Sequence, residues 1–597
     1  MEKQDNDISE NGKDSSDLVS QINPKEESAQ LVTDDGTQVA LPEWVAQTSE
    51  NNTPSDIPQI NKRNKLWTAF GIISFSILLL YYGFAIVNSL LMAFKDFLPA
   101  KGLQNSAFTG LDNFQLFLSD PLTQMIMGNT VRFSLLTILF TCIIVVPLIY
   151  GLNKINNIRV RIFLAGITFL PFLLTRTVLV EYLRPILTLS EKGSSSFSGQ
   201  GIRGIIIFLL LGAFYQTILI VPFLTLGLIM LSRCFTLSTK QFISIAVAAS
   251  IGFGWYSGFC GSLIPRRFFF EILRSLEIAT MPEYLFSIET SVSRFHFSTA
   301  GSVLTSVIGK SVLLFMGIAC IAILSRKKEP LQGVSSLSDR LVLPKKNAMG
   351  AIISMPALLI LFVVFIVGIS SAFTDHATVG ESLYQDFSVL PTVFSILFPF
   401  FGTLLGVALA GLTGQGKWSS RIFMLLSILY LLPSNTYMRQ EYYMLHRMGW
   451  TNTNMALIDF RFAILIPALF VGMYLKSGGK STFRIFCLTG ASYIYTSIYL
   501  FGDSFRSTIF YTSRKEQWTL PRVHFEVESY LNILMREDTS AAIGSGQGLF
   551  AGSIPVAIFL FLALIAASAL LVTALSEEKK NTETAQSKVL TQETESL

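Results

Sequence analysis

Charge is scarce in this sequence, and the scarcity sets its class. Asp, Glu, Lys and Arg together make up 14% of the 597 residues, whereas an ordinary soluble domain carries about 25%. Hydrophobic residues account for 51%, and the mean hydropathy is +0.52. This balance is not that of a soluble enzyme, and it predicts an all-α membrane protein.

Metal-binding, disulfide and catalytic patterns are lacking as well. The five cysteines fall singly in or beside apolar segments, with no Cys-x-x-Cys pair, so neither a disulfide framework nor a zinc site is indicated. The four histidines lie far apart, in or near expected loops. Paired carboxylates, His-Glu-x-x-His and a serine with a base do not occur in the apolar segments. We therefore expect no metal, no cofactor and no enzyme activity.

Residues 1–61 lack apolar periodicity and carry an excess of acid. They hold 13 Asp and Glu against 3 Lys, which predicts a disordered cytoplasmic tail. No signal-peptide pattern opens the chain, so the first spanning helix is expected to direct it to the membrane. Residues 62–597 carry a net charge of +15, because the tail contributes −10 to a total of +5. We interpret that excess as membrane topology and not as nucleic-acid binding.

Long apolar runs fill the rest of the chain. A spanning helix needs about 20 mostly apolar residues, and the runs predict six spans on each side of a basic cytoplasmic linker at 326–347. The first half is 62–325, the second half is 348–576, and 577–597 form a second cytoplasmic tail. The expected spans lie near 66–94, 126–151, 162–184, 203–232, 241–263, 299–324, 348–373, 388–413, 422–440, 456–475, 485–502 and 548–575.

Basic residues occur in every second connection, which predicts the orientation. Short basic loops stay in the cytoplasm, and the connections at 153–161, 232–240 and 476–484 each contain Lys or Arg. Both termini are therefore expected in the cytoplasm. The sequence predicts a multi-pass protein of a bacterial plasma membrane, with the lipid bilayer as its surroundings and no nucleic acid as a partner.

Several short elements follow one another in a recognisable order. The first span ends in Met92-Ala93-Phe94-Lys95-Asp96-Phe97. It is followed by Gly110-Leu111-Asp112-Asn113-Phe114, Asn129-Thr130 and Leu170-Pro171-Phe172, and in the second half by Leu432-Pro433, Met448-Gly449-Trp450 and Trp518-Thr519-Leu520-Pro521. In order and spacing, this series resembles the permeases of carbohydrate-uptake type I ABC importers.

The resemblance implies two permeases, normally separate chains that form one translocation path, joined head to tail as a pseudo-symmetric 6+6 bundle. It also implies an extracellular lipoprotein-type solute-binding protein as a partner. One family element is missing, however. Both halves lack the cytoplasmic Glu-Ala-Ala stretch whose short helix docks in the ATPase, which puts an ATPase partner in doubt. The residues in the short loops at that position are Arg233, Phe235, Lys240, Lys476, Lys480 and Phe483.

Charged and aromatic residues inside the spans are candidates for a substrate path, because charges at membrane depth are costly. Lys310 lies near the middle of the sixth expected span, where a substrate role and a structural pairing with a buried group both remain open. Packing or interface anchoring is the alternative for the others. The complete candidate set is Lys310, Tyr215, Gln216, Trp255, Tyr256, Asp459 and Arg461.

Two functions fit these observations. The first is a permease-like component of a carbohydrate transport system, with the path between the two halves. The second is a transport-incompetent pseudo-permease that serves as a receptor, scaffold or sensor for an extracellular solute-binding protein, without direct ATPase coupling. The order of the family-like elements favours the first function, and the missing docking stretch favours the second.

Overall fold

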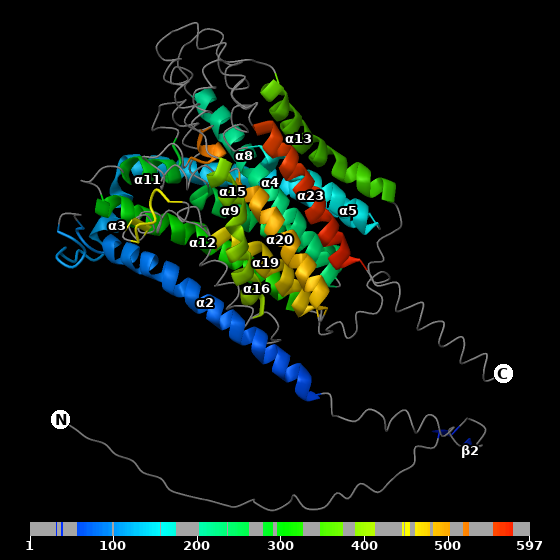
Figure 1. Ribbon diagram of the computed structural model, residues 1–597. Coiled ribbons are helices and arrows are strands. Elements are labelled where there is room, and N and C mark those ends of the chain that lie inside the picture. The colour runs from blue at the N-terminus through cyan, green and yellow to red at the C-terminus, as the bar shows by residue number, and fades with distance from the viewer. Residues whose placement is uncertain are drawn as a thin grey trace, which may run out of the picture. The chain divides into compact units, whose positions relative to one another are not determined.

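The computed structural model describes most of the apolar part of the chain (Figure 1). The described residues are 31–32, 38–39, 57–97, 101–155, 157–174, 202–235, 237–261, 279–289, 295–325, 347–373, 389–411, 445–446, 448–453, 460–477, 481–501, 518–523 and 553–576. The span expected near 422–440 and nearly all of the 326–347 linker lie outside them, as do Asp459 and Lys480.

The chain divides into two compact units, Met1–Lys62 and Arg63–Leu597. In the first unit, two short strands, β1 (Leu31–Val32) and β2 (Gln38–Val39), pair antiparallel, with Leu31 opposite Val39. The disorder expected for the remainder of the tail stays a prediction.

Helices make up the membrane part. In the first half they are α2 (Ile57–Ala93), α3 (Asp112–Ser119), α4 (Pro121–Asn153), α5 (Ile158–Ile167), the 3-10 helix η2 (Leu170–Leu173), α8 (Ile202–Cys234), α9 (Thr239–Cys260), α11 (Met281–Glu289) and α12 (Phe295–Ser325). In the second half they are α13 (Asn347–Phe373), α15 (Val389–Leu397), α16 (Pro399–Ala410), α19 (Phe460–Lys476), α20 (Thr482–Phe501) and α23 (Ser553–Leu575).

Seven helical segments among the described residues are long and apolar enough to cross a membrane. They are Pro121–Asn153, Leu209–Cys234, Thr239–Cys260, His296–Ser325, Met349–Val367, Pro391–Ala410 and Pro555–Leu575. Each coincides with an expected span, which confirms an all-helical, multi-pass membrane protein. The total of twelve spans and the 6+6 symmetry stay predictions.

The third expected span is not continuous. It was expected to run from 162 to 184, but α5 ends at Ile167, η2 follows, and Leu174 is extended with φ −102° and ψ 151°. Pro171 explains the break, because a proline has no N–H and its ring clashes with the carbonyl four residues earlier, here that of Ile167. An apolar run read from the sequence does not reveal such a break.

Small residues allow α9 to lie tightly against α4 and α12. A Cβ on Gly258 would overlap the Ser134 side chain of α4, and one on Gly254 would lie 2.9 Å from Ile138 Cα. On the other side, a Cβ on Gly252 would lie 2.9 Å from Leu313 of α12. Close packing of this kind is how small residues hold membrane helices together.

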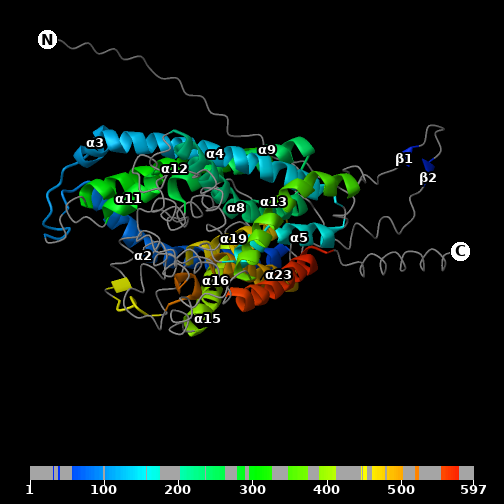
Figure 2. The ribbon, with the colours of Figure 1, turned by 90° about the horizontal axis from the view of Figure 1, so that it is seen from above.

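The first helix of each half contacts the other half. The α13 helix lies along α4, where a Cβ on Gly151 would be only 2.6 Å from Gly350 O (Figures 1 and 2). In the opposite direction, Ser74 Oγ of α2 donates a hydrogen bond to Leu405 O of α16 at 2.8 Å. The largest apolar core contains residues of both halves. The two halves therefore form one packed body.

Candidate functional site

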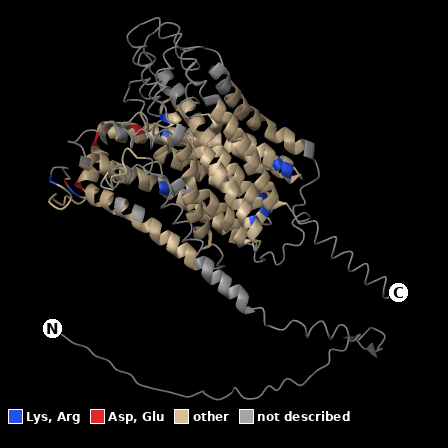
Figure 3. Ribbon diagram, viewed as in Figure 1, with Lys and Arg blue, Asp and Glu red and all other residues tan. Residues whose placement is uncertain are grey.

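The described acidic residues gather at one end of the helices, whereas cations occur at both ends. The described acidic residues of the second unit lie with α3 and α11, at what we call the acidic end (Figure 3). They are Asp96, Asp112, Asp120, Glu283 and Glu289. At the other end, the basic end, the described residues include no Asp or Glu. Their cations are Lys154, Arg159, Arg161, Arg233, Lys240, Lys476 and Arg484.

The α4 helix supplies a scale for the membrane. Arg132 is exposed and precedes Asn153, at the basic end, by 21 residues. That is about 32 Å of helix, close to the hydrocarbon thickness of about 30 Å. Exposed Leu135, Leu139 and Ile143 lie between them. We infer that the hydrocarbon layer ends near Arg132, so the first turns of α4 project about 16 Å beyond it.

Gln216 forms a buried polar pair between α8 and α9. Ser257 Oγ donates to Gln216 Oε1 at 2.7 Å, and Gln216 is 2% exposed. Each residue lies 18 positions from the basic end of its helix, or about 27 Å along it. The pair is therefore near the limit of the apolar layer on the side of the acidic end. Gln216 Nε2 has no hydrogen-bond partner among the described residues.

The aromatic candidates do not join Gln216 in a single site. Trp255 Nε1 donates to Ile308 O of α12 at 3.2 Å, and its ring stacks on Phe259 at 4.9 Å. Tyr256 is buried in an apolar cluster with residues of α2, α12, α16 and α19, and Tyr215 is buried in the main core. Packing accounts for these positions.

The charged candidates are also separated. Lys310 is half-buried on α12, 15 residues or about 23 Å from its basic end, so it lies nearer the acidic end than the basic end of the layer. Arg461 is in the first turn of α19, and its side chain lies outside the described residues, as does Asp459. The structure thus brings Gln216 to a polar partner and leaves Lys310 on a separate helix.

The connections at the expected ATPase-docking position are short. Four residues separate α8 from α9, and five separate α19 from α20. At the first connection, Arg233 in the last turn of α8 is half-buried, Phe235 packs on the main core, and Lys240 in the first turn of α9 is exposed. At the second connection, Lys476 at the end of α19 is half-buried, and Phe483 in the first turn of α20 is 64% exposed.

One repeated contact is not predicted from the sequence. In the first half, the backbone N–H of Met281 donates to Thr130 Oγ1 at 2.8 Å. In the second half, the N–H of Leu520 donates to Thr392 Oγ1 at 3.0 Å. Both amides belong to Thr-x-Pro segments, Thr280-Met281-Pro282 and Thr519-Leu520-Pro521. Both hydroxyls lie on the second span of their half. The Thr-x-Pro pattern, which occurs in both halves, is the sequence signal that could have predicted this contact.

The two Thr-x-Pro segments differ in the charge that follows proline. Glu283 in the first half is buried and accepts from both the backbone N–H, at 3.0 Å, and the hydroxyl of Thr280, so it caps α11. The corresponding residue of the second half is Arg522, whose guanidinium lies 5.3 Å from the centroid of the Trp518 ring. The halves are therefore alike in backbone contact and opposite in charge.

Aromatic rings from both halves meet at the break in the third span. Phe169 and Tyr495 lie 4.8 Å apart between ring centroids, and Phe172 and Tyr499 lie 5.1 Å apart. Phe223 of α8 completes the group at 4.4 Å from Tyr499. Proline-interrupted helices at the junction of two repeats are a known location of transporter binding sites. In this structure the rings are packed together.

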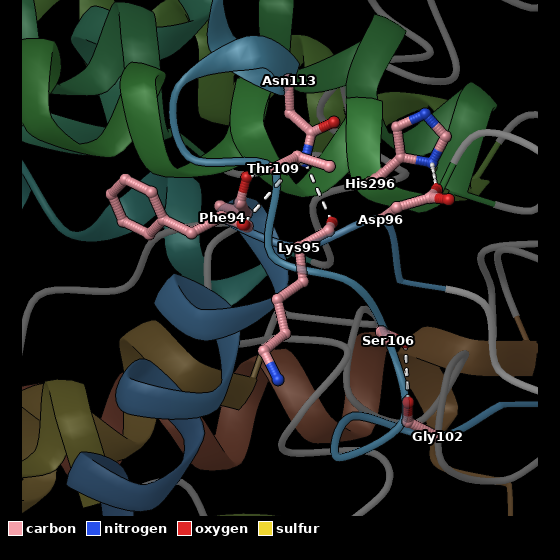
Figure 4. Close-up of polar contacts among 9 residues, drawn as sticks. Phe94, Lys95, Asp96, Gly102, Ser106, Thr109, Asn113 and His296 are labelled. Carbon is pink, nitrogen blue, oxygen red and sulfur yellow. Dashed lines mark hydrogen bonds and ion pairs between the residues drawn. The ribbon is translucent and has the colours of Figure 1, made fainter.

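The Lys95-Asp96-Phe97 and Gly110 to Phe114 elements form a clasp at the acidic end (Figure 4). Asn113 Nδ2 donates to Ala93 O at 2.9 Å, to Lys95 O at 3.0 Å and to Thr109 Oγ1 at 3.2 Å. The amide of Asn113 therefore closes the end of α2 over the start of α3. These elements hold the fold together at this end.

Asp96 also faces α12 across the clasp. Its carboxylate lies 3.7 Å from His296 Nδ1 (Figure 4). Both side chains are partly exposed. The contact therefore links the clasp to the first turn of α12 at the acidic end.

Arg161 forms a second clasp, at the basic end. Its guanidinium donates to the carbonyls of Asn153 and Ile155, where α4 ends. The arrangement satisfies carbonyl groups that the helix leaves without partners.

No family model, curated protein or solved structure matches this chain. The described residues also contain no group of three or more His, Cys, Asp or Glu that would hold a metal. The geometry offers buried hydroxyls, one buried amide pair and packed aromatic rings.

Proposed function

We propose that the chain is a permease-like component of a carbohydrate transport system of the ABC type, built from two related six-helix halves with the translocation path between them. The observation that carries the proposal is the repeated contact of Thr130 with Met281 and of Thr392 with Leu520. Duplication of one helix bundle explains why the same hydrogen bond, between a threonine hydroxyl and the amide of a Thr-x-Pro segment, recurs in both halves. Paired repeats around a shared centre are a common transporter design.

The exchange of first helices supports the same proposal. The α13 helix packs along α4, and α2 contacts α16 through the Ser74 hydrogen bond and through Leu78, which lies in one apolar cluster with Leu409. This reciprocity is expected for two related bundles around an axis along the membrane normal. Motion of one half against the other would then act at their junction, where the third span breaks at Pro171.

The charge distribution supports an orientation. Basic connections are retained in the cytoplasm, so the basic end, both termini and the linker would face the cytoplasm of a bacterial cell. The acidic end, which projects about 16 Å beyond the layer on the scale of α4, would then be extracellular. It is the surface that an extracellular solute-binding lipoprotein would meet.

The short connections between α8 and α9 and between α19 and α20 favour a second candidate. A specific stable interface buries about 1,200 to 2,000 Å², and connections of four and five residues offer little of that. In the second candidate, the chain is a pseudo-permease that serves as a receptor, scaffold or sensor without direct ATPase coupling.

Two measurements on the full chain separate the candidates. Purification in mild detergent would show whether an ATPase and a solute-binding lipoprotein accompany it, and both would be identified by mass spectrometry. Proteoliposomes would then be tested for uptake of labelled mono- and oligosaccharides. Uptake supports the permease, whereas a stable lipoprotein complex without uptake supports the pseudo-permease. If neither uptake nor a bound lipoprotein were found, both candidates would be contradicted.

A further inference from the structure

Basic and apolar side chains adjoin at the crossing of α4 and α13. Lys154, the residue after the last residue of α4, places Nζ 4.3 Å from the centroid of the Tyr150 ring. Arg159 lies in the first turn of α5 and is exposed. A Cβ on Gly350 would be 2.9 Å from Lys154 Cβ, so α13 reaches the same place.

The depth of these cations is that of lipid headgroups. On the scale of α4, Lys154 lies just past the basic limit of the apolar layer, about 33 Å from Arg132 along the helix. The described residues of the basic end provide no carboxylate to balance Lys154 and Arg159. An anion at this level would therefore be attracted by both.

Apolar side chains beside the cations distinguish a lipid from a soluble anion. Val160 and Phe163 of α5 are exposed, and Phe163 is 61% exposed. On α13, Met349 and Ile352 are exposed as well, and Ile352 is 71% exposed. These residues lie within the membrane on the proposed orientation, where acyl chains would cover them. A free phosphate would leave them without a role.

We propose that an anionic phospholipid binds at the basic end of the α4 and α13 crossing. Its phosphate lies between Lys154 and Arg159, and its acyl chains lie along Val160, Phe163 and Ile352. Because α4 belongs to the first half and α13 to the second, this lipid contacts both halves. The site does not depend on whether the chain transports a solute.

Native mass spectrometry of the full chain in detergent, with equal amounts of phosphatidylglycerol and phosphatidylcholine, tests the proposal. We expect preferential retention of phosphatidylglycerol. The preference should fall about fivefold for each charge removed in Lys154→Gln and Arg159→Gln, and about 25-fold in the double variant. Lys240→Gln is the matched control, because Lys240 is an exposed cation of the same end on another connection, and it should keep the preference.

Three further arms make the result decisive. A variant with Lys154→Arg and Arg159→Lys keeps both charges and should retain the lipid, which separates charge from misfolding. Millimolar inorganic phosphate and glycerol 3-phosphate should not displace phosphatidylglycerol, and displacement by either would overturn the assignment to a lipid. Equal losses in Lys240→Gln and the double variant, or no loss in either, would also overturn it.

Discussion

The backbone N–H of Met281 donates to the hydroxyl of Thr130, a residue 151 positions earlier in the sequence. The amide is the first of α11 and has no partner within its own helix. Thr130 is fully buried, and its hydroxyl also donates to Ile126 O at 2.8 Å. One side chain therefore satisfies an amide that would otherwise be buried without a partner.

Replacement of Thr130 by Val should leave the Met281 amide unsatisfied. We expect a loss of about 1–3 kcal/mol in the free energy of unfolding, and a similar loss for Thr392→Val at Leu520. Thermal unfolding in one detergent measures both. Thr573→Val is the control, because the exposed hydroxyl of Thr573 donates to Ala569 O of its own helix. If Thr130→Val were as stable as this control, the repeated contact would have no energetic role.

Substitution of Gly258 by Ala should separate α9 from α4. The added Cβ would overlap the Ser134 side chain, and overpacking of this kind costs about 1–3 kcal/mol. We expect a lower melting temperature and partial recovery when Ser134→Gly is added. Gly227→Ala on α8 is the control, since its Cβ would meet nothing within 4 Å. Equal melting temperatures for Gly258→Ala and Gly227→Ala would contradict the tight packing of α9 on α4 at Gly258.

The clasp at the acidic end should open when the Asn113 side chain loses its hydrogen-bond donor. Asn113→Asp retains the size of the side chain, but a carboxylate cannot donate to Ala93 O and Lys95 O. We expect faster hydrogen exchange in residues 94–112, with the spans unchanged. Gln115→Glu places a similar charge on the exposed side of α3 and should leave exchange as it was. The same exchange rate in both variants would contradict the clasp.

The proposed orientation predicts which sites react in intact cells. After the five native cysteines are replaced, a cysteine at exposed Lys101, at the acidic end, should be modified by a membrane-impermeant maleimide. A cysteine at Ser335 in the linker should react only after the cells are opened. Reaction of the Ser335 cysteine in intact cells would reverse the orientation or change the number of spans.

If the second candidate, the pseudo-permease, is correct, ATPase coupling should be weak or absent. We expect the purified chain to produce no substrate-stimulated ATP hydrolysis when mixed with a sugar-importer ATPase, because the connections at Phe235 and Phe483 are short. Coupled hydrolysis in proteoliposomes is the measurement. ATP-dependent sugar uptake that disappeared in Phe235→Ala or Phe483→Ala would show that these connections do transmit force.

Hydropathy predicted the seven membrane-length helices found among the described residues, because burial in lipid requires a long run of apolar residues whatever its neighbours are. It did not predict how each run would end. Pro147 remains within α4, whereas Pro171 coincides with the end of a helical run. The difference depends on what else can bond to the freed backbone groups, and a single sequence does not contain that information.

For the candidate residues too, the sequence predicted some features, and others depended on tertiary contacts. Gln216 was recognisable as a polar residue in an apolar run, but its partner Ser257 is 41 positions away. Asn113 belonged to a family-like element, yet its role as a clasp depends on carbonyl groups at Ala93 and Lys95. Residue type indicated which positions were unusual, and only the packing of the helices showed what each one contacts.

The close approach of Gly151 to Gly350 has a consequence for biosynthesis. The two glycines are about 200 residues apart in the chain, and synthesis at about 5–20 residues per second separates their emergence from the ribosome by about 10–40 s. Throughout that interval the Gly151 face of α4 has no α13 to cover it. The first half therefore enters the bilayer with this face of α4 uncovered. Its packing is completed only after α13, the first helix of the second half, has been synthesised.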